Sequence, residues 1–288
     1  MIVAVRETLG TVPLLPLQLL LALTGLALLF AAILVYGSTL SVLVRRGGRV
    51  GVGHFSLPDL FTASMLAVSV GAIAARTFVL PQSAAPEVTA DKLLPAQLYV
   101  IVIVAGIGGF LRWRGLKLGE VFGLRTLPVI AIVGAALLFL LAAFPLVTLT
   151  NHLSLLMLRK LAAEQPLVEL FRDLARGRDY PAMGQVFLAA VVIAPLCEEF
   201  LFRGYFYGVA KRYLGPLAGA FVTSLLFAAI HVNLASLPGL FVLALCLTAA
   251  YERTGSLLVP IGMHALYNFS SLLLLYLDAA GKLPLHAP

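Results

Sequence analysis

Two adjacent carboxylates and a guanidinium interrupt an apolar stretch near residue 200, which reads APLCEEFLFRG over positions 194–204. A charged side chain at the centre of a membrane helix costs about 2.5–3.5 kcal/mol on insertion scales, so such groups are normally paired or functional. Glu199 and Arg203 stand four residues apart, share a helix face and can form an ion pair. Glu198 points about 100° away from that face. It therefore must face another helix, a ligand or water.

Further polar side chains lie in the apolar runs that follow. His231 closes the stretch FAAIH at 227–231, and His264 and Asn268 stand four residues apart in a later run, where they share a helix face. A single histidine within a membrane is often a satisfied core residue. A carboxylate, two imidazoles and an amide on three helices instead predict one shared polar pocket.

Such a pocket predicts acid–base chemistry. A buried glutamate can serve as a general base, so Glu198 could take a proton from a water that His231 helps to position. His264 and Asn268 could donate hydrogen bonds to the oxyanion that forms on an attacked amide carbonyl. These steps amount to peptide hydrolysis without a covalent intermediate. No G-x-S-x-G or H-E-x-x-H motif points to a serine or standard zinc protease.

Two alternatives use the same residues. Glu198, His231 and His264 form a possible zinc ligand set, since one carboxylate and two histidines are known to bind zinc. Glu198 and His231 could also relay protons in a proton-coupled transporter, although no repeat-like halves with broken helices are visible. A scaffold or immunity protein without catalysis would leave these residues dispensable.

The elements that must position these residues are membrane helices. Of the 288 residues, 61% are hydrophobic and 11% are charged, whereas soluble domains carry about 25% charged residues. This composition excludes a soluble nucleic-acid-binding protein, despite the net charge of +7.

A membrane helix needs about 20 mostly apolar residues. We predict an all-α polytopic bundle of about eight spans at 15–37, 58–75, 94–111, 127–149, 184–209, 215–232, 236–251 and 256–277.

We expect a single membrane domain over 1–288, with the polar residues in a catalytic core at 184–277. The segment 150–183 contains apolar residues at helical spacing from Pro166 to Gly177, with charges on the other face. This pattern predicts an amphipathic helix at the membrane surface.

Cys197 and Cys246 both lie in apolar runs without metal or redox spacing, which argues against a disulfide framework.

The three motifs together resemble those of the CAAX prenyl protease type II and bacteriocin-processing (CPBP, or Abi) intramembrane proteases. The matching motifs are Glu198-Glu199-x-x-x-Arg203, Phe227-x-x-x-His231 and His264-x-x-x-Asn268, within about 184–270. The resemblance implies an all-helical membrane endopeptidase. It also implies that Glu198 and His231 activate water, that His264 and Asn268 form the oxyanion hole, and that Glu199 and Arg203 support them.

The family has been described as both metal-dependent and glutamate-dependent. We favour the glutamate form without a metal cofactor, because Asn268 suits an oxyanion better than zinc. The expected partners are membrane lipid and a membrane-anchored peptide or protein, such as a prenylated chain or a C-terminal tail, and not nucleic acid. The expected location is a multi-pass position in a prokaryotic cell membrane, or in the endoplasmic reticulum membrane of a eukaryote.

Overall fold

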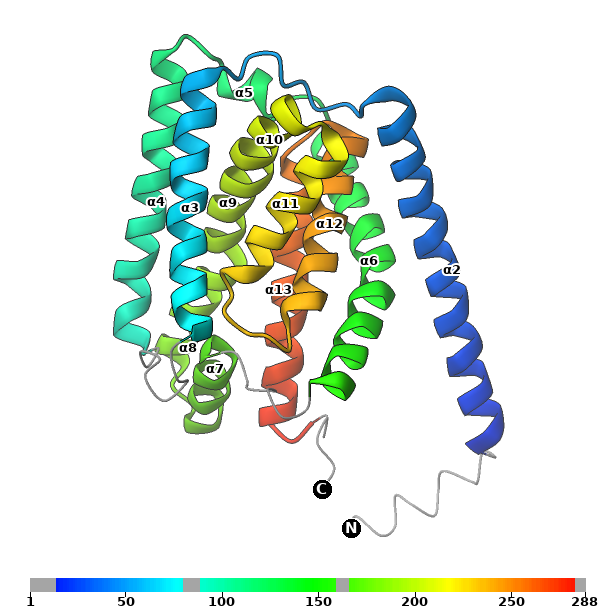
Figure 1. Cartoon of the computed structure of the whole chain (residues 1–288). Coiled ribbons are helices and arrows are strands. Elements are labelled where there is room, and N and C mark those ends of the chain that lie inside the picture. The colour runs from blue at the N-terminus through cyan, green and yellow to red at the C-terminus, as the bar shows by residue number, and fades with distance from the viewer. Residues whose placement is uncertain (1–13, 80–88, 159–165, 283–288) are drawn as a thin grey trace.

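The computed structural model describes residues 14–79, 89–158 and 166–282, and all of the regular structure in these ranges is helical (Figure 1). The helices are α2 (Leu14–Arg46), α3 (Leu57–Val79), α4 (Ala90–Trp113), α5 (Leu118–Val121), α6 (Val129–Met157), α7 (Pro166–Gly177), α8 (Tyr180–Phe187), α9 (Ala194–Glu199), α10 (Tyr207–Leu214), α11 (Pro216–Ala229), α12 (Leu237–Thr254) and α13 (Leu258–Ala279). Two π-helical segments, η3 (Leu188–Ile193) and η4 (Phe200–Phe206), join α8, α9 and α10 into one continuous helix, Tyr180–Leu214.

Within the described ranges, six helices are long and apolar enough to cross a membrane: α2, α3, α4, α6, Tyr180–Leu214 and α13. Lipid offers no hydrogen-bond partners to the backbone, so a segment that crosses it must pair its own N–H and C=O groups, as a helix does. The predicted all-α polytopic membrane bundle is therefore confirmed. All eight predicted spans are helical, but two do not meet this standard. At 14 residues, α11 is roughly 21 Å long against a hydrocarbon core of about 30 Å. The last turn of α12 contains two charged residues, Glu252 and Arg253, which shorten its apolar stretch.

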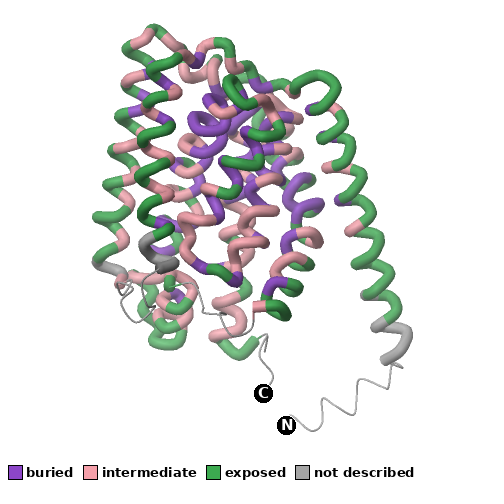
Figure 2. The backbone as a smooth tube through the Cα atoms, viewed as in Figure 1, coloured by how far each residue is buried: buried purple, intermediate pink, exposed green. Residues whose placement is uncertain are grey.

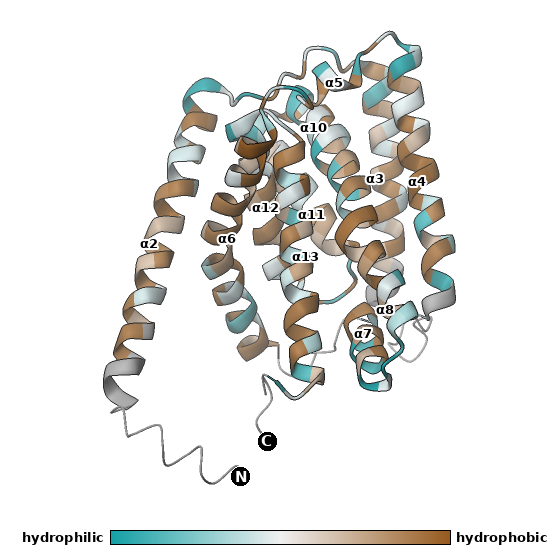
Figure 3. Cartoon of the chain, turned by 180° about the vertical axis from the view of Figure 1, so that it is seen from behind, coloured by the Kyte–Doolittle hydropathy of each residue, from teal (hydrophilic) through white to brown (hydrophobic). Residues whose placement is uncertain are grey.

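Burial is concentrated in the helices that carry the polar residues. In Figure 2 the buried stretches lie in the middle of the bundle, whereas α2 and α4 at its sides are largely exposed. The exposed surface of these outer helices is apolar, including Leu26 and Phe30 of α2 and Val102 of α4. Figure 3 shows hydrophobic colour along most of the helix lengths and hydrophilic colour near their ends. This distribution is typical of a surface that faces lipid.

A buried ion network joins the α2–α3 connection to the core. The Glu252 carboxylate at the end of α12 accepts hydrogen bonds from Lys211 Nζ at 2.5 Å and from the Tyr207 hydroxyl at 2.6 Å. Its other oxygen accepts from the backbone N–H of Val50 at 3.2 Å, and Lys211 Nζ also donates to the Val50 carbonyl at 2.8 Å. The network thereby fixes this connection against α10 and α12.

The segment predicted at 150–183 is divided in the structure. Residues up to Met157 continue α6, and α8 begins at Tyr180, while residues 159–165 lie outside the described ranges. The amphipathic stretch itself is α7. Its Leu167, Leu170 and Phe171 pack in a small core with Val186 of α8 and Leu272 of α13. The predicted amphipathic helix therefore exists, and its apolar face packs on protein at the end of the bundle away from α5 (Figure 1).

Candidate active site

The two adjacent glutamates lie between π-helical segments of the Tyr180–Leu214 helix. At the end of η3, the Ala194 N–H donates to the carbonyl of Ala189, five residues back, instead of four. Pro195 follows and has no N–H to donate. Glu198 and Glu199 come at the end of α9, and η4 begins at Phe200. Such π-helical turns occur often at functional sites because they alter the direction of the side chains that follow.

Glu199 is the centre of a buried ion pair. Its Oε1 accepts hydrogen bonds from Arg203 Nη1 and from His264 Nδ1, each at 2.8 Å, and the side chains of Glu199 and Arg203 are 0% and 2% exposed. Arg203 also donates to the Ala244 carbonyl at 3.3 Å and lies over the Phe227 ring, 4.3 Å from its centroid. The pair thus connects the glutamate helix to α11, α12 and α13.

Glu198 has no such partner. It is partly exposed to the cavity described below, and its Oε2 has no hydrogen-bond partner among the described residues. A buried carboxylate oxygen of this kind is costly unless it meets water or a ligand. Among the described residues Glu199 Oε2 also lacks a partner, but Glu199 is held through Oε1 by Arg203 and His264. The neighbouring carboxylates therefore occupy different environments, because only Glu199 is held by an ion pair.

His231 lies outside the helix that the sequence predicted for it. α11 ends at Ala229, and His231 occupies the connection to α12. Its Nδ1 lies 2.8 Å from the Phe227 carbonyl. Since a carbonyl oxygen only accepts, Nδ1 carries the hydrogen and Nε2 keeps a lone pair in the neutral ring. The span 215–232 was predicted too long because apolar residues continue past the helix end.

The connection that carries His231 is tightly held. Val232 has a φ of +51°, which is unusual for a β-branched residue. Asn233 Oδ1 accepts from the Ser236 N–H at 2.9 Å, and the Ser154 hydroxyl of α6 donates to the Ala235 carbonyl at 2.7 Å. Backbone strain of this kind persists only where surrounding contacts impose it. α6 therefore helps to fix the position of His231.

Asn268 shares a face of α13 with His264, as the sequence predicted, but its amide has a backbone partner. Asn268 Nδ2 donates to the Ala190 carbonyl of η3 at 2.8 Å. His264 is buried and donates to Glu199. One turn of α13 thus contacts the glutamate helix at two points, before and after Pro195.

One cavity of about 580 Å³ brings the four predicted catalytic residues together. Glu198, His231, His264 and Asn268 all line it. The remaining wall is mostly apolar and includes Leu residues of α7, α12 and α13, with isolated polar groups from α6 and the start of α12: Leu167, Leu240, Leu243, Leu272, Leu275, Asn151 and Ser236. The cavity can therefore hold a largely apolar chain beside a carboxylate and two imidazoles.

The alternative metal set does not form a ligand cluster. Within the described ranges, no three His, Cys, Asp or Glu side chains gather closely enough to hold a metal ion. Glu198, His231 and His264 line the same cavity without meeting that requirement. Cys197 and Cys246 are both buried and free, in agreement with the prediction that they form no disulfide.

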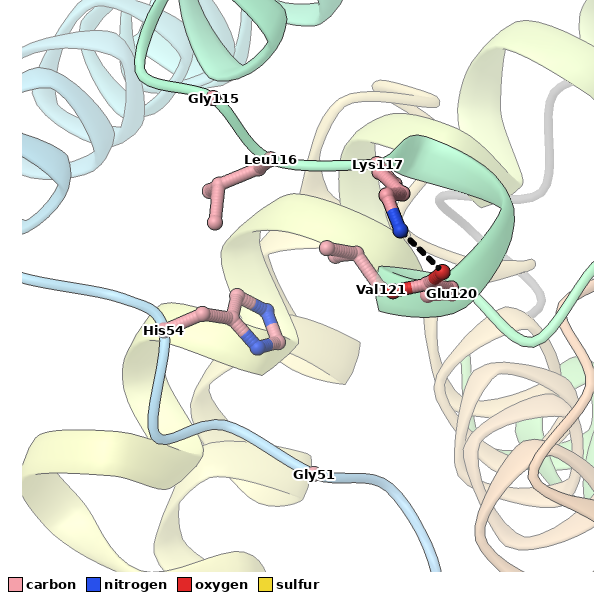
Figure 4. A pocket seen from close by; sticks show the side chains of 7 residues that line it. All are labelled: Gly51, His54, Gly115, Leu116, Lys117, Glu120 and Val121. Carbon is pink, nitrogen blue, oxygen red and sulfur yellow. Dashed lines mark hydrogen bonds and ion pairs between the residues drawn. The ribbon is translucent and has the colours of Figure 1, made fainter.

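A second cavity of about 350 Å³ lies elsewhere, between the α2–α3 connection and α5 (Figure 4). His54 faces this space, and Lys117 and Glu120 form an ion pair at its edge, at 3.0 Å. Partial burial lowers the pKa of His54 below its ordinary value, as does the nearby Arg114, while Asp59 opposes the shift. None of the sequence-predicted site residues lines this cavity.

Comparison with known proteins finds a family match for the part of the chain that carries the polar residues of the larger cavity. Residues 182–270 match the family model of the Rce1-like type II CAAX prenyl endopeptidases. The resemblance stated from the three motifs is thereby confirmed, and the match contains Glu198, His231, His264 and Asn268. Helices α2 to α7 precede the Rce1-like region.

A curated relative covers a similar share of the chain. An uncharacterized 24.3 kDa protein of Escherichia coli is 38% identical over 109 residues, which are 36% of this chain and 48% of the relative. The chain thus spans about half the length of that relative. No solved structure matches the chain significantly.

Several contacts at the site had no clear signal in the sequence. The pairing of Glu199 with His264 joins residues 65 positions apart, and the bond from Ser154 to Ala235 spans 81 positions. Pro195 was the one sequence signal of an irregular helix. It did not reveal the π-helical turns on either side of the glutamates.

Proposed function

We propose that the chain is an intramembrane endopeptidase that hydrolyses a peptide bond of a membrane-associated substrate, with Glu198 and His231 activating the water. The observation that carries this proposal is that Glu198, for which the described part of the structure shows no ion pair, lines the same cavity as His231. The Rce1-like match over 182–270 independently favours CAAX-type proteolysis.

The proposed reaction begins with a water held between Glu198 and His231. The Nε2 lone pair of His231 accepts one water hydrogen bond, and Glu198 removes the other proton as oxygen attacks the scissile carbonyl carbon. Glu198 then returns the proton to the amide nitrogen, so that the C–N bond breaks into a carboxylic acid and an amine. No covalent enzyme intermediate is needed.

His264 is the candidate donor to the developing oxyanion. Its Nδ1 hydrogen is committed to Glu199, so only the imidazolium form has a second hydrogen, on Nε2, that can point into the cavity. Glu199 orients the His264 ring through this hydrogen bond, and Arg203 holds the Glu199 carboxylate in place. Glu199 and Arg203 therefore act on the reaction through His264.

The proposed substrate is a lipid-anchored or tail-anchored peptide. The apolar wall of the cavity is suited to a hydrocarbon chain, and the isolated polar groups of Asn151 and Ser236 can meet a peptide backbone. A prenylated C-terminal peptide is the form that the family description favours.

Cleavage by the full-length protein in proteoliposomes tests the proposal. The probe is a fluorogenic CAAX peptide, with and without a farnesyl group. Glu198→Gln should lower kcat by roughly 10²–10⁴-fold, the usual contribution of a general base. Glu120→Gln, which changes an exposed carboxylate outside the cavity, is the matched control and should leave the rate unchanged.

Full activity of Glu198→Gln would refute the assigned base. Loss of wild-type activity in chelator, with recovery on added zinc, would replace the metal-free mechanism with the metal-dependent one. Absence of cleavage, together with uptake of a solute that depends on a pH gradient and on Glu198, would favour the transporter.

A further inference from the structure

Pro195 leaves one backbone carbonyl of the glutamate helix without its helical partner. The Ala194 N–H donates to the carbonyl five residues back, so in the same register residue 195 would donate to Ala190. Proline has no N–H, and this bond cannot form. Ala190 is buried beside the larger cavity, where an unsatisfied carbonyl is costly unless another donor reaches it.

Asn268 supplies that donor. Its Nδ2 donates to the Ala190 carbonyl at 2.8 Å across a sequence separation of 78 residues. One turn earlier on α13, His264 donates to Glu199. α13 therefore holds the glutamate helix on both sides of Pro195, and Glu198 lies between the two points of contact.

We infer that Asn268 is a positioning residue that replaces the missing proline N–H and so holds the π-helical turn that directs Glu198 into the cavity. The inference rests on the proposed function for its catalytic consequence. It differs from the role that the family resemblance gives Asn268, which is to donate to the oxyanion of the substrate.

The two roles predict different behaviour when position 195 regains its N–H. If Asn268 satisfies Ala190, then Pro195→Ala supplies a backbone donor and makes Asn268 less necessary. If Asn268 binds the oxyanion, its loss costs the same in either background, typically 10²–10³-fold in kcat. A double-mutant cycle over these positions separates the two roles.

The experiment compares Asn268→Ala, Pro195→Ala and the double variant, as full-length protein in proteoliposomes with the farnesylated peptide. We expect Asn268→Ala to lower kcat by at least about fivefold with little change in KM, since losing a bond to a buried carbonyl corresponds to roughly 5–150-fold in an equilibrium. Pro195→Ala should stay within about threefold of wild type, and the double variant should resemble Pro195→Ala. Ser270→Ala, whose hydroxyl bonds only within α13, is the control on the same helix.

Thiol labelling gives a readout that needs no proteolysis. In a Cys246→Ala background, Cys197 is the only thiol, and it is buried on α9 beside Glu198. If the π-helical turn relaxes to an α-helix, the residues that follow rotate by about 100°. Asn268→Ala should therefore label with a small maleimide at least about fivefold faster than its parent, and adding Pro195→Ala should reverse the increase.

Equal loss of kcat in both backgrounds, or unchanged labelling of Cys197 in Asn268→Ala, would overturn the inference. If Asn268→Ala does not fold, the near-isosteric Asn268→Leu takes its place in the cycle. A wild-type protein that cleaves no peptide would refute the proposed function, while the labelling comparison would still decide the role of Asn268.

Discussion

Removing Arg203 should expose the cost of an unpaired charge in this bundle. Arg203 and Glu199 are almost fully buried and 2.8 Å apart. Arg203→Met keeps much of the side-chain volume but removes the guanidinium that pairs with the Glu199 carboxylate. Breaking a buried pair in this way costs roughly 3–5 kcal/mol. For a chain of this size that loss corresponds to a fall in Tm of roughly 6–10 °C, at about 2 °C per kcal/mol.

The assay is thermal unfolding of the purified protein in detergent, followed by circular dichroism at one fixed scan rate. The double variant Glu199→Gln/Arg203→Met removes both charges and keeps an acceptor for His264. It should therefore recover at least half of the Tm lost in Arg203→Met. Lys117→Met, which breaks an ion pair whose side chains are 77% and 74% exposed, is the matched control and should shift Tm by less than about 2 °C.

Two results would refute this reasoning. One is a Tm shift for Arg203→Met no larger than that for Lys117→Met. The other is a double variant less stable than Arg203→Met, which would mean that the Arg203 contacts with Phe227 and the Ala244 carbonyl outweigh the charge balance.

Three further predictions concern contacts away from that ion pair. Ser154→Ala leaves the Ala235 carbonyl unsatisfied and should cost about 1–3 kcal/mol in unfolding experiments, with a lower kcat because the His231 connection loosens. Gly123→Ala should lower Tm by several degrees, because Gly123 has a φ of +62° and its Cβ would overlap the Gly255 carbonyl. His54 has a lowered pKa in the folded state, so wild-type Tm should fall as pH drops through its ordinary value of about 6.5. His54→Asn should reduce that pH dependence between pH 5 and about 7.

The membrane helices were predictable because their signal is local. Apolar runs of about 20 residues located the six helices that can cross a membrane, and also α11 and α12, since lipid requires each segment to satisfy its own backbone. The Glu199–Arg203 pair was also predictable, because residues four apart share a helix face. The end of α11 was not, since the apolar residues Val232 and Leu234 continue the hydropathy pattern into the connection.

The details of the site depend on contacts between distant segments. Sequence spacing grouped Glu198, His231, His264 and Asn268, and the structure places all four on one cavity. Spacing did not indicate which donors and acceptors of these side chains already form hydrogen bonds within the protein. That assignment separates Glu198, which has a free carboxylate oxygen, from Asn268, whose amide donates to backbone.

The bond from Ser154 to Ala235 has a consequence for protein engineering. α6 lies outside the 182–270 region, yet it anchors the segment that carries His231. An excised fragment limited to 182–270 would retain every motif residue and lose this anchor, together with the cavity wall that Asn151 provides. A minimal or transplanted version of this centre must therefore begin no later than Val129, where α6 starts.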